Sequence, residues 1–422
     1  MEADVDREAA GLAPDIGHAD YPLVRDKRMW WSQYNLFRDD SFQGFWRDHL
    51  TDNSKVLVIV GRGFDPRALF SLNLILKQRP QVDRHCIAIE MAKCFETDEE
   101  AVRLRTINED GLRALFPGES MEIRDLSPTD ADGIRDISRA TAHLFADVAR
   151  NDGRYTDVVL DISTLPRLVY LTLLNQLLAA FVRPAEPSPL AASVNLHIVY
   201  AESSLIDQSI SKREVDVDLA PLPSLGIRLE EEASHDWPKV WFPVLAEDVV
   251  GQLERIYSRI SPDDVCPVLP LQSVDPRRGD NIIRELGELV FDRMAVAPRD
   301  MIYATEWNPF QLYRSLLQAM ERYEESLHLF GGARFIISPL SSKSLSIGCL
   351  LALFEKRMRG DRARMRVGMA HIETRRYEAN DLGHDLPMVP ISLWLAGDCY
   401  KIETALEVIP EPPAEASDKD AR

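Results

Sequence analysis

The sequence has few cysteines, and no two of them are closely spaced. Its five cysteines are Cys86, Cys94, Cys266, Cys349 and Cys399. Structural zinc sites usually draw on CxxC pairs, so the sequence predicts no metal site. An odd number of scattered cysteines is typical of a reducing compartment, and we therefore expect a cytoplasmic protein.

Long hydrophobic runs are also missing. The longest apolar stretch, residues 168–182, is too short to span a bilayer and carries Thr172, Asn175 and Gln176. The N-terminal segment MEADVDREAAGLAPD is acidic and lacks the apolar core of a secretory signal. We therefore expect no membrane partner.

Three familiar phosphate and catalytic motifs are absent. The loop GRGFDPR begins like a dinucleotide fingerprint, but Pro66 stands where the third glycine of G-x-G-x-x-G is required. The chain has no GxxxxGK[ST] loop, no HExxH and no GxSxG. The sequence thus gives no support to an NAD enzyme, a P-loop ATPase, a zinc protease or a serine hydrolase, and we expect no cofactor.

Basic residues are a minority. Lys and Arg number 49 and Asp and Glu number 68, so the formal net charge is −19. Such a field repels the phosphate backbone of duplex DNA, and we expect no general DNA binding. A local basic pocket for a small anion remains compatible with this charge.

What the chain does contain is a regular alternation of apolar strands and amphipathic or apolar helices, in a length of 422 residues that suits two domains. Such alternation predicts parallel sheets with right-handed crossovers. We therefore predict an α/β protein with two Rossmann-like, doubly wound parallel-sheet halves in one chain. The expected strands are 55–60, 85–90, 121–124, 157–162 and 194–200 in the first half, and 265–271, 300–305, 334–338, 366–372 and 388–396 in the second.

The flanking segments differ in composition from the two halves. We expect an N-terminal tail and aromatic cap at 1–50, a first domain at 51–202, a proline-rich and acidic connecting segment at 203–263, a second domain at 264–408, and a disordered acidic tail at 409–422. The cap is rich in aromatic residues, which we expect to pack on the first domain: Trp30, Trp31, Tyr34, Phe37, Phe42, Phe45 and Trp46.

Two short sequence repeats indicate that one half is a duplicate of the other. The tripeptide DPR at 65–67 follows the first predicted strand of one half, and DPR at 275–277 follows the first predicted strand of the other. Aligning DISTLPR with the later stretch SPLSSK places Arg167 opposite Lys343.

Ligands of open α/β sheets bind beyond the carboxyl ends of the strands, which directs attention to the loops there. In GRGFDPR, Gly61 and Gly63 would let backbone N–H groups approach an anion, and Arg62 and Arg67 would supply charge. The simpler interpretation of this loop is that Asp65 caps a helix starting at the next residue, a proline.

The loop DISTLPR holds the most specific pattern. Asp161 ends a buried strand, Ser163 and Thr164 offer hydroxyls, and Arg167 opens a helix, a combination that predicts a small anion or nucleotide site or, alternatively, a plain capped helix start. The pattern Asp-x-Ser-x-x-x-Arg resembles the signature of CARF domains. These are Rossmann-like sensors of cyclic oligonucleotides in prokaryotic antiviral immunity. Two fused units of this kind are similar to SAVED sensors.

The resemblance implies that Asp161, Ser163 and Arg167 contact a ligand. The second half departs from the signature, with Ile337 and Pro339 opposite the acidic residue and the serine. A second site would therefore use three residues that follow its strand: Ser341, Ser342 and Lys343.

The loop QSVDPRRGD adds a further candidate. Ser273, Arg277 and Arg278 lie after a predicted strand, and clustered arginines are exceptional in so acidic a chain. They would bind an anion, or the loop is merely solvated and Asp280 caps the next helix.

These residues support one leading function and two alternatives. The leading hypothesis is a sensor of antiviral defence that binds an anionic, nucleotide-type ligand, such as a cyclic oligonucleotide, and signals to a protein effector within an oligomer. One alternative is an enzyme that cleaves such nucleotides, for which Glu90, Glu202 and Glu306 at strand ends are candidate acids. The other is a structural subunit of a defence complex.

Overall fold

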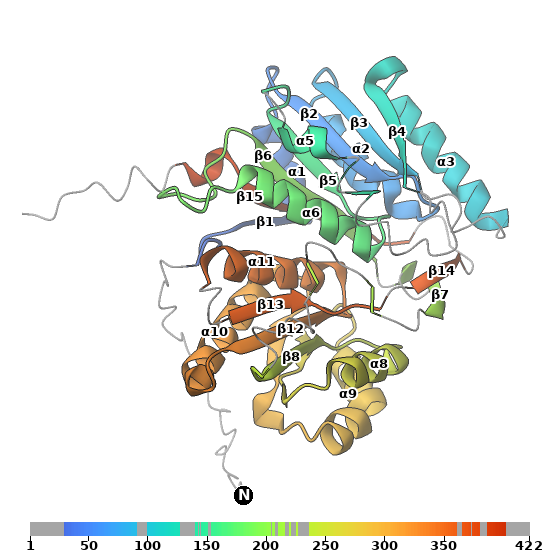
Figure 1. Ribbon diagram of the computed structural model, residues 1–422. Coiled ribbons are helices and arrows are strands. Elements are labelled where there is room, and N and C mark those ends of the chain that lie inside the picture. Colours follow the sequence, from blue (N-terminus) through green and yellow to red (C-terminus); the bar gives the residue numbers. More distant parts are fainter. Residues whose placement is uncertain are drawn as a thin grey trace, which may run out of the picture.

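The computed structural model (Figure 1) describes residues 29–401 apart from 91–98, 127–139, 142, 144, 151–152, 204, 207–209, 216–218, 221–224, 227–235, 361–364, 373 and 380–385. The predicted acidic tail at 409–422 lies outside these residues. None of the described helices is both long and apolar enough to cross a membrane.

A seven-stranded sheet forms the first half. Its order is β1-β15-β6-β5-β2-β3-β4. Strands β2 to β6 are mutually parallel, β15 is antiparallel to β6, and β1 is antiparallel to β15. The strands are β1 (Asn35–Arg38), β2 (Lys55–Gly61), β3 (Asp83–Glu90), β4 (Met121–Asp125), β5 (Asp157–Asp161), β6 (Asn195–Glu202) and β15 (Val389–Ala396). The helices are α1 (Asp40–His49), α2 (Phe70–Gln78), α3 (Glu99–Leu115), α5 (Ala146–Arg150) and α6 (Arg167–Phe181).

A parallel sheet of six strands forms the second half. Its order is β11-β10-β8-β12-β13. The two-residue strand β9 pairs with the first half of β8, and β10 pairs with the end of β8. The strands are β8 (Lys239–Val244), β9 (Asp264–Val265), β10 (Val268–Leu271), β11 (Ile302–Thr305), β12 (Ala333–Pro339) and β13 (Met365–Met369). The helices are α8 (Val250–Ile260), α9 (Arg278–Gly287), α10 (Pro309–Leu327) and α11 (Lys343–Arg359).

The two halves have the same topology. Numbered within each half, the five parallel strands of both sheets run in the order 3-2-1-4-5, and a helix follows each of the first four strands. β7 (Ile210–Val215) follows the last parallel strand of the first half, and β14 (Thr374–Ala379) follows that of the second. These two strands pair antiparallel and form a separate two-stranded sheet. The predicted fold of two Rossmann-like halves in one chain is confirmed.

Two strands lie elsewhere than the sequence predicted. β8 comes from the expected connecting segment and is the central strand of the second sheet, and β15 returns from the end of the second half to the first sheet. The sequence hid β8 because Pro243 lies within it, and proline is expected only at edges and ends of sheets. Here Pro243 stands one residue from the carboxyl end of the strand.

The DPR repeat was therefore matched to the wrong strand of the second half. Asp65 follows β2, the first strand of its half, whereas Asp275 follows β10, the second strand of the other. The register places Val60 opposite Asp161, and Phe242 opposite Ile337. The true counterpart of the loop at 61–67 is therefore the stretch after Phe242, which is acidic rather than basic. The predicted alignment of Arg167 with Lys343 is confirmed, because α6 begins at Arg167 and α11 begins at Lys343.

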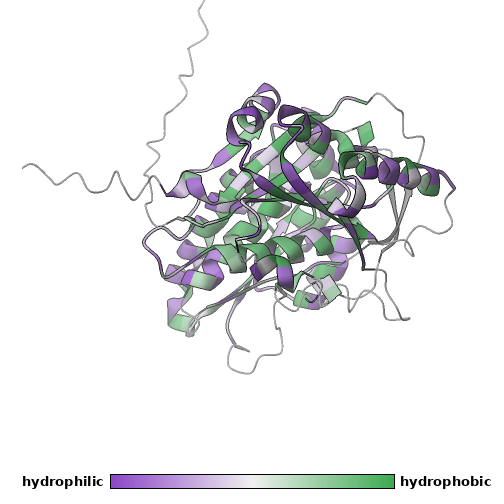
Figure 2. Cartoon of the chain, turned by 90° about the horizontal axis from the view of Figure 1, so that it is seen from above, coloured by the Kyte–Doolittle hydropathy of each residue, from purple (hydrophilic) through white to green (hydrophobic). Residues whose placement is uncertain are grey.

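A continuous core joins the halves. Helices α6 and α11 contact each other between the two sheets (Figure 1), and buried side chains of both halves, such as Leu174 and Leu353, belong to one cluster. These helices are apolar on nearly every face because each is covered by a sheet on one side and by the other helix on the other. Figure 2 shows hydrophobic residues gathered in this interior and hydrophilic residues on the outer helices.

The aromatic N-terminal segment is a cap, as predicted, but it packs on both halves. Phe42 and Trp46 of α1 join the core of the first sheet. The Trp31 indole donates to the backbone oxygen of Leu395 in β15 at 2.9 Å, and its ring meets that of Tyr313 in α10 edge-on at 5.6 Å. This segment therefore ties the first sheet to the helices of the second.

Close packing of α10 against α11 gives a direct test of the arrangement. A Cβ on Gly348 would lie 2.4 Å from the backbone oxygen of Pro309, whereas a Cβ on Gly251 in α8 would meet nothing within 4 Å. We expect Gly348→Ala to lower the unfolding free energy by about 1–3 kcal/mol through overpacking. Gly251→Ala should raise it by up to about 1 kcal/mol through helix propensity. Urea unfolding of both variants checks this, and a shift of the same sign in both would contradict the packing described.

Candidate functional site

Two loops of the first half meet because the strands before them are neighbours. β2 and β5 are parallel and adjacent, so the loops after them leave the sheet side by side. The Thr164 hydroxyl donates to the backbone oxygen of Gly61 at 2.8 Å. A Cβ on Gly61 would lie 2.5 Å from that hydroxyl oxygen, so glycine is required there for this contact between loops.

The second half reaches into the same place. The Lys343 ammonium group, at the start of α11, donates to the backbone oxygen of Ser163, and the Arg167 guanidinium, at the start of α6, donates to the backbone oxygen of Ser341. The first residue of each helix thus crosses to the loop that precedes the other helix. We call residues 61–67, 161–167 and 341–343 together the seam site.

The N-termini of α6 and α11 adjoin at the seam site. Ser342 caps α11 by accepting from the Leu345 backbone N–H at 3.4 Å. A helix N-terminus carries partial positive charge, so the two cations at 167 and 343 lie where they are electrostatically unfavourable. The Nε atom of Arg167 and the hydroxyl of Ser341 are buried and lack a hydrogen-bond partner among the described residues. The seam site therefore has unused capacity to donate hydrogen bonds to an anion.

Two buried carboxyl groups, those of Asp161 and Asp65, lie close enough to Lys343 to interact with its charge, and their pKa values shift in opposite directions. Asp161 is fully buried; its Oδ1 accepts from the Ser163 backbone N–H at 2.8 Å, and its Oδ2 lacks a partner within the described part of the chain. Burial raises the pKa of Asp161 to about 7, against the charge of Lys343. Burial also opposes ionisation of Asp65, but the charge and hydrogen bonds of Arg67 outweigh it and lower the pKa of Asp65.

The two arginines of the glycine loop are held by acidic residues. Arg67 is buried and forms a two-pronged ion pair with Asp65, with Nη2 to Oδ2 at 2.6 Å and Nε to Oδ1 at 2.9 Å. Arg62 pairs with Glu90 and with Glu109 of α3. The predicted helix cap at Asp65 is present, since its carboxylate also accepts from the Arg67 backbone N–H.

Ser163 faces the protein rather than the loop surface. It is fully buried, and its hydroxyl accepts from the Ala201 backbone N–H at 3.1 Å. Its side chain therefore holds the loop against β6, while its backbone oxygen binds Lys343. In this arrangement Asp161 and Ser163 shape the seam site, and Arg167 and Lys343 supply its charge.

The third predicted group of residues makes separate contacts. Arg278 pairs with Glu306 after β11 and lies 4.0 Å from Glu247 after β8. Arg277 is exposed, and its backbone N–H donates to the side chain of Asp275. Asp280 lies inside α9, which begins at Arg278, so the prediction that Asp280 caps this helix is wrong. The contacts of the described residues thus divide the predicted site into the seam site and this loop.

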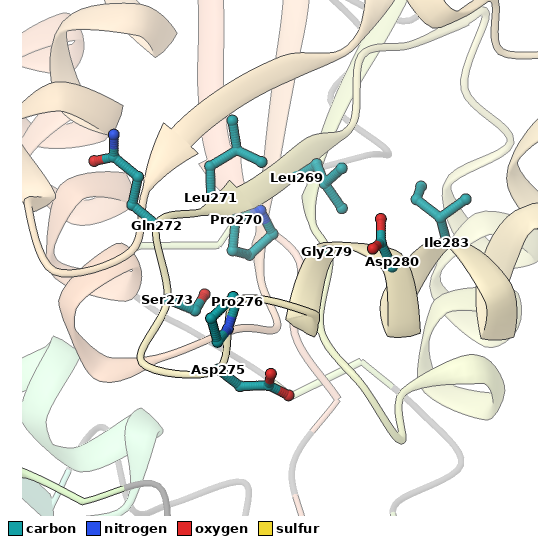
Figure 3. Close-up of a pocket in the computed structure, with 10 residues that line it drawn as sticks. All are labelled: Leu269, Pro270, Leu271, Gln272, Ser273, Asp275, Pro276, Gly279, Asp280 and Ile283. Atoms are coloured by element: carbon teal, nitrogen blue, oxygen red, sulfur yellow. The ribbon is translucent and has the colours of Figure 1, made fainter.

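A small cavity adjoins the loop after β10 (Figure 3). Its volume is about 180 Å³, below the roughly 300 Å³ at which ligand pockets usually begin. Asp275 and Asp280 bring two carboxylates to its lining. The cavity is therefore a poor site for an anion. It is lined by Leu269, Pro270, Leu271, Gln272, Ser273, Asp275, Pro276, Gly279, Asp280 and Ile283.

The second half lacks a basic counterpart of the glycine loop. By register, the residues after Phe242 take the place of 61–67, and they include Glu247 and Asp248 in place of arginines. The pseudo-symmetric seam therefore has one basic side, contributed by the first half, and a single composite anion site fits it better than two equal sites.

Sequence reasoning missed two residues of α3 that support the loop at 61–67. The Asn108 amide donates to the backbone oxygens of Gly63 and Asp65 at 2.8 and 2.9 Å, and Glu109 holds Arg62. Asn108 is buried in an otherwise amphipathic helix, and a polar residue on the apolar stripe was the signal available in the sequence. The loop that follows β3, at 91–98, lies outside the described residues.

No family model matches the chain, and no curated protein does. Among solved structures, a protein assigned as a universal stress protein from Pseudomonas aeruginosa UCBPP-PA14 is 9% identical, with a TM-score of 0.20, over 76% of this chain and 94% of that one. A functionally unknown protein from Pseudomonas aeruginosa PAO1 is 10% identical, with a TM-score of 0.19 and the same coverage.

Proposed function

We propose that this protein is a sensor that binds an anionic, nucleotide-type ligand at the seam site and passes a conformational signal to a partner protein. The observation that carries the proposal is the reciprocal crossing of Arg167 and Lys343 between the halves. Each cation lies at the first residue of a helix and donates to a neutral backbone oxygen of the opposite loop. An anion placed there would contact both halves at once.

The backbone oxygen that Arg167 binds is a weak competitor for a phosphate. A phosphate oxygen carries negative charge that a backbone oxygen lacks, so a guanidinium group is attracted to it more strongly. Exchange of the Ser341 backbone oxygen for a phosphate oxygen at Arg167 is therefore favourable. Arg62 and Arg67 are already paired with carboxylates, so their exchange gains less, and we assign them a role in shaping the loop.

The route of the signal follows from the packing. α6 and α11 start at the seam site and run through the shared core between the two sheets. A ligand that binds one relative position of the two helices better than another will shift the halves toward that position. The resemblance of Asp161, Ser163 and Arg167 to the CARF signature supports a cyclic oligonucleotide as the ligand class and antiviral defence as the setting.

The test is a thermal-shift screen of the purified chain against linear and cyclic di-, tri- and tetranucleotides and the common mononucleotides. A ligand of the native state raises the melting temperature by mass action. Loss of one charge-assisted phosphate contact costs about 1.5–3 kcal/mol, so Arg167→Ala and Lys343→Ala should each weaken binding by about 10- to 150-fold.

A matched control accompanies these variants. Arg277→Ala removes an exposed arginine of the separate loop and should leave the affinity unchanged. Unchanged affinity in a folded Arg167→Ala protein would overturn the proposed site, and the absence of any thermal shift across the whole panel would favour a purely structural subunit.

A second candidate function rests on Asp161. A carboxyl group with a pKa near 7 beside an anion site has the property of a general acid or base, as cleavage of a nucleotide ligand would require. We infer that a nuclease activity of this kind would depend on Asp161. Chromatography of the bound nucleotide after incubation tests it: product formed by the wild type and not by Asp161→Asn supports cleavage, and intact ligand throughout supports sensing alone.

A further inference from the structure

A cluster of two histidines and an aspartate lies at the opposite end of the first sheet from the seam site. His49 is the last residue of α1, Asp157 is the first of β5, and His197 lies near the start of β6. The seam loops follow the carboxyl ends of the same strands. The cluster therefore plays no direct part in the proposed ligand site.

The ligand atoms of these three side chains converge. The Nε2 of His49 lies 2.7 Å from Oδ1 of Asp157, the Nε2 of His197 lies 3.5 Å from the same oxygen, and one nitrogen or oxygen from each residue falls within 4.8 Å of the others. We propose that His49, Asp157 and His197 form a binding site for a divalent transition-metal ion, with zinc as the best-fitting ion.

His197 provides the second, independent observation. It is fully buried, yet neither ring nitrogen has a hydrogen-bond partner among the described residues. A neutral imidazole has one donor and one acceptor, and leaving both unused in the interior is unfavourable. A metal ion bound to Nε2 satisfies one of them.

Groups around the cluster fix the carboxylate. The Asn195 amide donates to Oδ1 of Asp157 at 3.0 Å, and the Thr156 hydroxyl donates to Oδ2. Such bonds orient a metal-binding carboxylate.

Aromatic rings surround the two imidazoles. The Trp46 ring lies 4.8 Å from that of His197, and the Trp394 ring lies 4.7 Å from that of His49, measured between centroids. Phe45 stacks on His49 at 5.0 Å. These rings hold the imidazoles in place and keep bulk water away from them.

The donor set selects the ion. Two imidazole nitrogens and one carboxylate oxygen suit Zn²⁺, whereas Mg²⁺ and Ca²⁺ prefer oxygen ligands throughout. Three protein ligands leave one tetrahedral position for a water molecule. The ion would link α1 to β5 and β6 and would therefore stabilise the first half.

The test uses the full chain stripped with a chelator and then titrated with zinc chloride or cobalt(II) chloride. We expect one zinc ion per chain to survive gel filtration, a raised melting temperature, and visible absorption of bound Co²⁺ that is typical of tetrahedral coordination. Asp157→Asn and His49→Gln should each weaken the affinity by more than about 100-fold. Circular dichroism verifies that both variants fold. His49 is the least buried of the three ligands, so its substitution is expected to disturb folding less than that of Asp157.

His85→Gln is the matched control, because His85 is a partly exposed histidine of the same sheet outside the cluster. It should bind zinc as the wild type does. Failure of the stripped wild-type chain to retain zinc, or equal loss of zinc in His85→Gln and Asp157→Asn, would overturn the proposal and indicate adventitious binding at exposed histidines. Neither outcome bears on nucleotide binding at the seam site.

Discussion

Trp31→Ala should lower the free energy of unfolding by about 3–5 kcal/mol, as expected for loss of a large buried aromatic side chain. Trp31 is fully buried, bonds to the backbone of β15 in the first sheet, and packs against Tyr313 in the second half. Its removal opens a cavity between the halves and leaves the Leu395 oxygen without its donor. Chemical denaturation followed by far-ultraviolet circular dichroism measures the loss.

Trp31→Phe separates the two contributions. It keeps most of the buried ring and loses the indole N–H, so we expect a cost of about 1–3 kcal/mol from the unpaired carbonyl. A Trp31→Ala protein that unfolds at the wild-type denaturant concentration would contradict the role of this segment in joining the halves.

Asp161→Asn should abolish a pH dependence of stability that the wild type possesses. The pKa of Asp161 is about 7 in the folded protein and 3.8 for the ordinary side chain, so the folded state retains a proton that the unfolded chain releases. The stabilisation that protonated Asp161 gives the folded state is therefore fully present below about pH 4, and it is lost as the pH rises toward 7. About three pH units at roughly 1.4 kcal/mol each give a loss of about 4 kcal/mol.

Urea unfolding at several pH values between 4 and 8 measures this dependence. Asparagine keeps the bond to the Ser163 backbone N–H and carries no charge, so its unfolding free energy should fall less over this range. Asp65→Asn is the matched contrast: Arg67 lowers the pKa of Asp65 below its ordinary 3.8, so the stabilisation by this carboxylate is lost only below about pH 4. This substitution should therefore leave the slope between pH 4 and 8 unchanged. Parallel curves for the wild type and Asp161→Asn would contradict the buried, partly protonated state of this carboxyl.

Much of the fold was predictable because its signals are local. Buried parallel strands such as β2 and β5 are continuous apolar runs, and the sequence marks them directly. β8 was missed because proline within a strand normally argues against one, and only the position of Pro243 near the strand end resolves this. β15 was placed in the wrong half because its partner, β6, is far away in the sequence.

The candidate site was predicted in part for a related reason. The sequence identifies Arg67 as a cation, but it cannot show that Asp65 neutralises it or that Glu90 and Glu109 hold Arg62. Its alignment of Arg167 with Lys343 was sound, since both are the first residues of equivalent helices. That each crosses to the other half depends on how two distant segments pack, and no local pattern encodes it.

The most direct test of the account is the stoichiometry of binding, measured by isothermal titration with the nucleotide that gives the largest thermal shift. The account predicts one ligand per chain, bound at a composite site, with about 10- to 150-fold weaker binding in both Arg167→Ala and Lys343→Ala and none of this loss in Arg277→Ala. Two equal sites per chain, or a loss confined to one of the two seam variants, would contradict a single site shared by the halves.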